Sequence, residues 1–185
     1  MSQERPKSGM ITMLNPRTRS AARLRDELTA SHSVLRDEAA TCLSAVAAVS
    51  EGRNADVGRV VHRFRSFLGL VSGYCEGRRT LLWPVLAQLF PSGADELVRL
   101  TRQSLALVSD VSEVDGALEV LRAAAHFSQD DRIAVTGAAR GTIRPAKILH
   151  DSLCLHLGDE ELVLRDLLGG LSLQQITWAR RTLAL

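Results

Sequence analysis

Apolar residues recur every three or four positions through most of this chain. That spacing places them on one face of an α-helix. Strand-like segments rich in aromatic residues and Thr are nearly absent, and aromatic residues make up only 4% of the 185 residues. Leu, Ala, Arg and Val, which mostly favour or tolerate helix, are abundant. The sequence therefore predicts an all-α protein.

Breaks in the pattern divide the chain into long predicted helices followed by a short one capped by Ser172. The expected bounds are approximately Arg19–Val49, Val57–Leu89, Ala94–Ala125, Ala146–Leu168 and Leu173–Leu183. Pro84 predicts a kink or local break in the second helix, and Asp115-Gly116 predicts one in the third. Long amphipathic helices with short connections are typical of a four-helix bundle. Residues 1–18, interrupted by Pro and Gly, are expected to be a flexible tail, with residues 19–185 as the bundle.

The stretch from Ser128 to Pro145 is less periodic and contains Gly137 and Gly141. We expect a long connection or a short helix there, which could cover a pocket as a lid. Its run Val135–Gly141 resembles the phosphate loop of short-chain dehydrogenases. That loop requires a preceding strand and a surrounding parallel sheet, so we discount it here.

Charge and hydropathy narrow the class of protein. The net charge of +2 does not point to a nucleic-acid partner, and none is expected. No apolar stretch is long enough to span a membrane, and the polar segment Met1–Met13 is not a secretory signal. Cys42, Cys75 and Cys154 lie in helical stretches, as reduced thiols do. We therefore expect a cytoplasmic protein.

Three polar side chains interrupt the predicted apolar faces. His32 lies within the apolar stripe of the first helix. His156 and Glu160 are four residues apart on the fourth helix and point the same way. A His and a carboxylate aimed into a bundle core can bind a metal ion. Alternatively, His156 and Glu160 form a surface pair; if Glu160 is buried, it requires a metal, another cation or a hydrogen-bond donor.

Two arginines on the second helix bear on this question. Glu76 and Arg79 are three residues apart, so they share a helix face and can pair. Arg78 and Arg79 both lie near positions where the stripe should be apolar. One of them could enter the core and neutralise Glu76 or Glu160, and its guanidinium would then compete with a metal cation. The sequence leaves open whether Arg79 points into the core.

Together these residues resemble the hemerythrin-like, or HHE cation-binding, family, whose four-helix bundles hold two irons. The family's first-helix His followed by Leu-Arg reads His32-Ser-Val-Leu-Arg here. Its second-helix His-Glu-x-x-Glu and Leu-aromatic-Pro read Cys75-Glu76-Gly77-Arg78-Arg79 and Leu82-Trp83-Pro84, and its fourth-helix His-x-x-x-Glu-Glu reads His156-Leu-Gly-Asp-Glu160-Glu161. The resemblance covers roughly Leu24 to Leu183. It implies a hemerythrin-like four-helix bundle with a short C-terminal helix.

The departures from the family remove part of the ligand set that the resemblance implies. Cys75 stands where the family has a ligand His, Arg79 where it has a bridging Glu, and Ser104 near another usual His. The family ligand positions that survive are His32, Glu76, His156 and Glu160. Two histidines and a carboxylate can still hold one iron, but a full di-iron centre and reversible oxygen carriage are not expected.

Two functional hypotheses follow. In the first, the old metal site is a metal-free small-molecule pocket, with acid–base chemistry in place of redox chemistry. Its catalytic candidates are His32, His156, Glu160 and Glu76, and its substrate-binding candidates are Tyr74, Cys75, Arg79 and Ser104. In the second, a cation-binding, oxygen-related or sensor protein holds one iron at His32, His156 and Glu160. A regulatory or scaffold bundle without a ligand is a third reading, and the oligomeric state stays open.

Overall fold

The computed structural model describes residues 16–53, 56–127 and 132–184 of the chain, and these are helical apart from short connections. The elements are α1 (Pro16–Thr29), α2 (His32–Ser50), α3 (Val57–Gly77), the π-helical turn η1 (Arg78–Leu82), α4 (Trp83–Leu89), the 3-10 turn η2 (Pro91–Gly93), α5 (Ala94–Phe127), α6 (Arg132–Gly169) and α7 (Leu173–Thr182). No strand occurs among these residues, so the predicted all-α class is confirmed.

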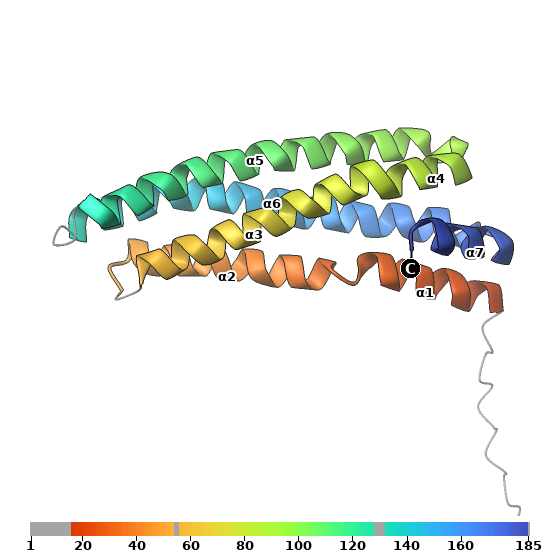
Figure 1. Ribbon diagram of the computed structural model, residues 1–185, viewed down its shortest axis with the longest axis horizontal. Coiled ribbons are helices and arrows are strands. Elements are labelled where there is room, and N and C mark those ends of the chain that lie inside the picture. Colours follow the sequence, from red (N-terminus) through yellow and green to blue (C-terminus); the bar gives the residue numbers. More distant parts are fainter. Residues whose placement is uncertain (1–15, 54–55, 128–131, 185) are drawn as a thin grey trace, which may run out of the picture.

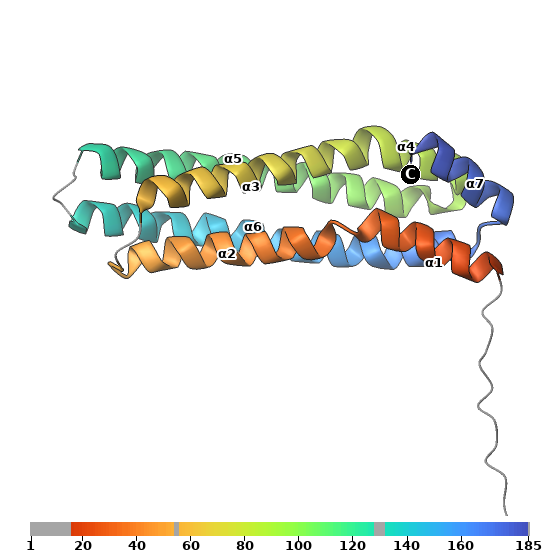
Figure 2. The same cartoon turned by 60° about the horizontal axis from the view of Figure 1, so that its bottom comes forward.

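The helices form long rods that lie side by side. Figures 1 and 2 show α1 and α2 end to end along one rod and α3, η1 and α4 along a second, with α5 and α6 as the other two. Helix α6 packs against α5, α2 and α1, and α3 packs against α5 and α2. The short helix α7 folds back against α1 and α4 at one end.

The first rod is broken where the sequence predicts one continuous helix from Arg19 to Val49. Helix α1 begins at Pro16, inside the expected tail, and ends at Thr29, while α2 begins at His32. The prediction failed because the apolar spacing continues across the break, through Leu28, His32 and Leu35. No Pro or Gly marks the break, and the side chain of Ser31 does not cap α2. Residues 1–15 lie outside the described part.

The predicted disturbance near Pro84 is confirmed, in the form of a π-helical turn. In η1 the backbone N–H of Trp83 donates to the carbonyl of Arg78, five residues earlier. Pro84 has no N–H to donate, so a wider turn immediately before it costs little. The turn carries Arg78 at its start and Leu82 at its end, and both reach the candidate site described below.

Two other sequence predictions are wrong. Helix α5 runs unbroken through Asp115-Gly116, where the exposed Gly116 interrupts no backbone hydrogen bond. Residues 132–145, predicted to be a long connection or a short helix, are helical, but they form the first part of α6 and not a separate connection or lid. Their buried face consists mainly of small residues, including Ala139 and Pro145, so it gives a weak apolar signal. Residues 128–131 lie outside the described part.

The interior has two apolar clusters, one towards each end of the rods. One includes Leu35, Phe64, Leu107 and Leu153, and the other includes Leu24, Leu82, Leu100 and Leu164. Along each rod the change from one cluster to the other occurs at a polar side chain. No helix of the described residues is long and apolar enough to cross a membrane.

The cap of α7 can be tested by substitution. The hydroxyl of Ser172 accepts from the N–H of Gln175, and the side chain of Gln175 accepts from the N–H of Ser172. Ser172→Ala should destabilise α7 by about 1 kcal/mol, because the hydroxyl satisfies a helix N-terminal donor. Amide hydrogen exchange within α7 should accelerate. The control Ser112→Ala, in an exposed mid-helix position, should leave that exchange unchanged; equal rates in both variants would contradict the cap.

Candidate functional site

A layer of polar side chains separates the two apolar clusters. His32 lies between Leu28 and Leu35, Ser104 between Leu100 and Leu107, and His156 and Glu160 between Leu153 and Leu164. The side chains of these polar residues are almost fully buried. Tyr74 and Arg78 complete the layer from the second rod. Because buried polar groups need partners, each member constrains the others.

His32 is held in place by Glu161, a partly exposed carboxylate at the edge of the layer. Its Nδ1 lies 2.8 Å from Oε1 of Glu161, which also receives Arg36 at 2.9 Å. An ionised carboxylate only accepts hydrogen bonds, so Nδ1 carries the proton. Burial acts to raise the pKa of Glu161, but hydrogen bonds from Arg36 and His32 outweigh it and hold that pKa below its usual value. Glu161 therefore fixes the ring and leaves Nε2 facing the interior.

Tyr74 joins His32 to Glu160. Its hydroxyl lies 2.9 Å from Nε2 of His32 and also forms a hydrogen bond with Oε2 of Glu160. Burial, followed by the negative charge of Glu160, raises the pKa of the Tyr74 hydroxyl far above its usual value. The hydroxyl consequently keeps its proton at neutral pH.

The two hydrogen bonds of Tyr74 require a second proton in the group. A hydroxyl supplies one proton, so its oxygen must accept the other bond. Either a doubly protonated His32 donates to Tyr74 and Tyr74 donates to a Glu160 carboxylate, or a protonated Glu160 donates to Tyr74 and Tyr74 donates to a neutral His32. The two arrangements have the same total charge and differ only in the position of two protons. The geometry thus supports a short proton relay through the Tyr74 hydroxyl.

Arg78 supplies the cation that Glu160 requires. Its Nε lies 2.9 Å from Oε1 of Glu160, and the two side chains are 12% and 0% exposed. Neither atom has a hydrogen-bond partner of good geometry, so the contact is mainly an ion pair. The guanidinium carbon also lies 4.7 Å from the centre of the Tyr74 ring, within the range of a cation–π contact.

The guanidinium of Arg78 binds a backbone carbonyl at the break between α1 and α2. Its Nη2 donates to the carbonyl of Leu28, in the last turn of α1. The last carbonyls of a helix have no following turn to bond with, so they are free to accept from a side chain. In a continuous helix the Leu28 carbonyl would be taken by the backbone N–H of His32. The break and the inward path of Arg78 therefore depend on each other.

His156 forms the other side of the layer. Its Nε2 lies 3.3 Å from Oγ of Ser104 and 3.8 Å from Oε2 of Glu160, and its Nδ1 lies 3.2 Å from Oε1 of Gln103. The amide nitrogen of Gln103 donates to Asp159, so its oxygen accepts the Nδ1 proton of His156. Burial is the main cause of a lowered pKa for His156. The ring is therefore assigned as neutral, with Nε2 as an acceptor.

The geometry of the polar layer does not fit a metal site formed by His32, His156 and Glu160, the ligands considered from the sequence. Nε2 of His32 and Nε2 of His156 lie 3.5 and 3.8 Å from opposite oxygens of Glu160. Oε1 of Glu160, the oxygen nearest His32, also faces the Arg78 cation. Within the described ranges, no three His, Cys, Asp or Glu side chains are grouped so that they could hold a metal ion. A cation at Glu160 would have to displace Arg78.

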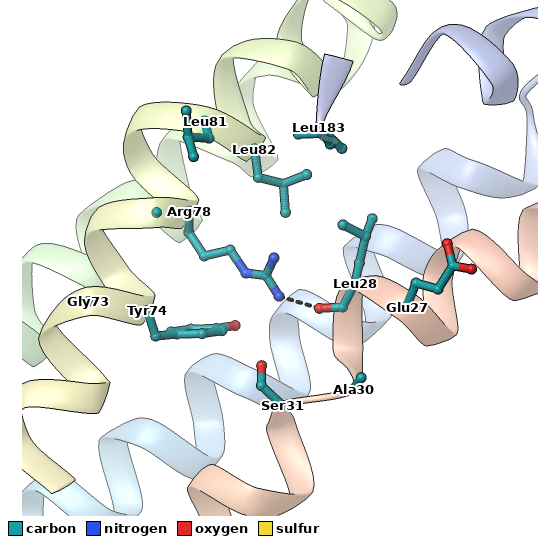
Figure 3. Close-up of a pocket in the computed structure, with 11 residues that line it drawn as sticks. Glu27, Leu28, Ala30, Ser31, Gly73, Tyr74, Arg78, Leu81, Leu82 and Leu183 are labelled. Carbon is teal, nitrogen blue, oxygen red and sulfur yellow. Dashed lines mark hydrogen bonds between the residues drawn. The ribbon is translucent and has the colours of Figure 1, made fainter. Parts of the chain in front are cut away.

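A pocket of about 390 Å³ opens onto this layer beside the break in the first rod. Its lining is largely apolar, and its polar members include Ser31, Tyr74 and Arg78. Figure 3 shows Arg78 extending from the second rod towards Leu28, with the ring of Tyr74 beneath it and Leu82 and Leu183 above. The volume is at the low end of the range of about 300–1,000 Å³ usual for small-molecule sites.

The structure brings together most of the site residues expected from the sequence. His32, His156, Glu160, Tyr74 and Ser104 all lie in the layer. Helical spacing left open whether Arg78 or Arg79 enters the core, and Arg78 is the one that does.

Three expected members lie elsewhere. Glu76 and Arg79 are exposed and pair with each other on the surface of the second rod, so neither the predicted catalytic role nor the predicted substrate contact is supported by their position. Cys75 is packed in an apolar cluster, where burial raises its pKa to about 11. Arg78, not Arg79, continues the face of Tyr74 four residues later.

Sequence reasoning missed Glu161, Gln103 and Arg36 as supports of the two histidines. Glu161 adjoins Glu160 in the quoted motif, which was an available signal. Arg36 is four residues after His32 and is the Arg of the quoted first-helix motif, so it was also available, although its contact with Glu161 was not. No spacing rule could find Gln103, because its contact with His156 joins residues far apart in sequence.

Comparison with known proteins adds no assignment: no family model, curated protein or solved structure matches the chain. The resemblance to the hemerythrin-like family therefore stays a prediction from the motifs.

Tyr74 is the only tyrosine in the chain, so tyrosinate absorbance reports on it alone. The ordinary pKa is 10.0, and the folded value lies far above it. Above pH 10 the unfolded chain loses this proton while the folded chain retains it, so stability should fall as pH rises. Tyrosinate should appear only together with loss of helical circular dichroism. Ionisation near pH 10 with the helices intact would contradict the burial of the hydroxyl.

The ion pair can be tested by removing one partner. Arg78→Met should lower the free energy of unfolding by about 3–5 kcal/mol, because it leaves the buried Glu160 carboxylate without its cation. Adding Glu160→Gln to that variant should restore part of the loss. Urea denaturation measures both effects, and the exposed Arg79→Met serves as the matched control. A loss no larger in Arg78→Met than in Arg79→Met would refute the assignment.

Proposed function

We propose that this chain is a hemerythrin-like bundle whose former metal layer has become a metal-free small-molecule site, and that it acts on its ligand by acid–base chemistry. The observation that carries the proposal is Tyr74. Its hydroxyl takes part in the relay with His32 and Glu160, and the same residue lines the pocket. A ligand in the pocket would therefore lie next to a group that can exchange protons.

Tyr74 is the proton donor to the ligand in this proposal. Its raised pKa makes direct loss of the proton costly, but a proton passed on from His32 or Glu160 replaces the one that leaves. Glu161 holds the outer nitrogen of His32 and is 41% exposed, so the relay reaches solvent on the side away from Tyr74. His156 packs against Oε2 of Glu160 from the opposite flank, at 3.8 Å, without donating to it.

The ion pair of Glu160 and Arg78 favours the metal-free reading over a mononuclear iron site. A guanidinium already neutralises the carboxylate at 2.9 Å. The layer also argues against a bundle without a ligand. Buried charge pairs are often no more stabilising than apolar residues of similar volume. A bundle that served only as a scaffold would therefore gain no stability from an ion pair beside a pocket.

Fragment binding observed by amide NMR tests the pocket. Carbonyl-containing fragments should shift the amides of Gly73 and Gly77, which line it. A methyl-sized addition at Gly77 or at Gly69 meets no other group, and Gly69 does not line the pocket. Gly77→Met should thus abolish the shifts by filling the space, while Gly69→Met on the same helix should preserve them. Equal shifts in both variants would place the fragments elsewhere.

Deuterium exchange tests the chemistry. In deuterated water, Tyr74 should protonate the carbonyl oxygen of a bound fragment while a solvent water takes its α-hydrogen, and reversal of this step should exchange the α-hydrogen for deuterium. The exchange should be much slower with Tyr74→Phe, which keeps the ring but removes the hydroxyl. Mass spectrometry of the fragment follows the exchange. Fragments that bind but exchange no faster than in buffer would remove the acid–base part of the proposal and leave a binding protein.

A further inference from the structure

The pocket contains hydrogen-bond donors that the protein does not use. A guanidinium has five N–H groups. In Arg78, Nη2 donates to Leu28 and Nε faces Glu160. Within the described part of the chain, Nη1 makes no hydrogen bond of good geometry, although the guanidinium also interacts with the Tyr74 hydroxyl and acts to lower its pKa. Figure 3 shows the guanidinium ending among the residues that line the pocket. The side chain is only 12% exposed, so water has limited access to these donors.

The charges around the pocket leave it positive. Arg78 is balanced by Glu160, and Glu27, which also lines the pocket, is paired with Arg180. Arg23 lies 3.0 Å from the same Glu27 oxygen and adds a further positive charge. Both carboxylates are in contact with these cations, so the charges around the pocket sum to a small positive excess. Oε2 of Glu27 is buried without a hydrogen-bond partner, so an anionic group is favoured at Arg78 and not beside Glu27.

Apart from Ser31, the remainder of the lining is apolar and determines the body of the ligand. Leu28, Leu81, Leu82 and Leu183 surround the space from three different segments of the chain. Such walls bind hydrocarbon and offer nothing to a second charged group. A ligand that satisfies both parts has one anionic head and one compact apolar body.

We infer that the ligand is a small apolar carboxylate, bound with its carboxylate on Arg78 Nη1 beside the Tyr74 hydroxyl and its hydrocarbon body against the leucines. This inference rests on the proposed function and names the class of molecule that the site accepts. A carboxylate matches the planar guanidinium better than a neutral carbonyl does, because both partners are charged and their hydrogen bonds are the stronger kind. It also completes the donor set of Arg78 without displacing Glu160.

Three probes with the same phenylpropyl body and different heads test the inference: hydrocinnamate, hydrocinnamide and phenylpropylamine. Titration calorimetry on the wild type should show that hydrocinnamate binds roughly tenfold more tightly than the amide, with the amine weakest. Gly77→Met should abolish hydrocinnamate binding, and the matched Gly69→Met should retain it. Because the head-group comparison uses the unaltered protein, it does not depend on whether an Arg78 variant folds.

Each contrary outcome has a distinct meaning. Equal or tighter binding of the amide or the amine would overturn the carboxylate assignment while leaving the pocket and its relay in place. Hydrocinnamate binding that survives in Gly77→Met would place the probe outside the pocket and also overturn the inference. If none of the three binds, the inference fails, and the carbonyl fragment screen decides separately whether the proposed function fails with it.

Discussion

The buried carboxylate of Glu160 is the constraint on which the rest of the structure depends. It lies at the junction of two apolar clusters and is fully enclosed. A charge in that position is tolerated only with a cation and hydrogen-bond donors around it. Arg78 supplies the cation and Tyr74 a donor. The polar layer is the set of side chains that makes one buried charge acceptable.

Two irregularities of the backbone occur at this layer, and both help to position the Arg78 side chain. The π-helical turn begins at Arg78 itself, and the break between α1 and α2 exposes the Leu28 carbonyl that receives its guanidinium. Short π segments often occur at functional sites because they redirect side chains without ending the helix. Here the redirected side chain points into the bundle and its neighbour Arg79 points out. The pocket lies where the two irregularities face each other.

The capacity of the site for proton transfer follows from the number of protons shared by Tyr74, His32 and Glu160. Tyr74 has one proton for two hydrogen bonds, so His32 and Glu160 must share another. His156, neutral because of burial, is bonded to Ser104 and Gln103 and orients the layer from the side. A site of this kind supports proton exchange with a bound molecule, and its unused Arg78 donors give that molecule an anionic head in our inference.

The sequence by itself determined the all-α class, the closing capped helix and the residues that interrupt the apolar faces. Periodicity reports which side chains face inward, and His32, His156 and Glu160 stand at inward positions whatever their partners are. It could not reveal the break before His32, because the apolar spacing crosses it unchanged. It could not extend α6 back to Arg132, because small residues fill that buried face. Only the tertiary structure decided that Arg78 enters the core while Arg79 and Glu76 stay outside. That choice depends on the π turn and on a carbonyl from another helix, and neither leaves a mark in local spacing.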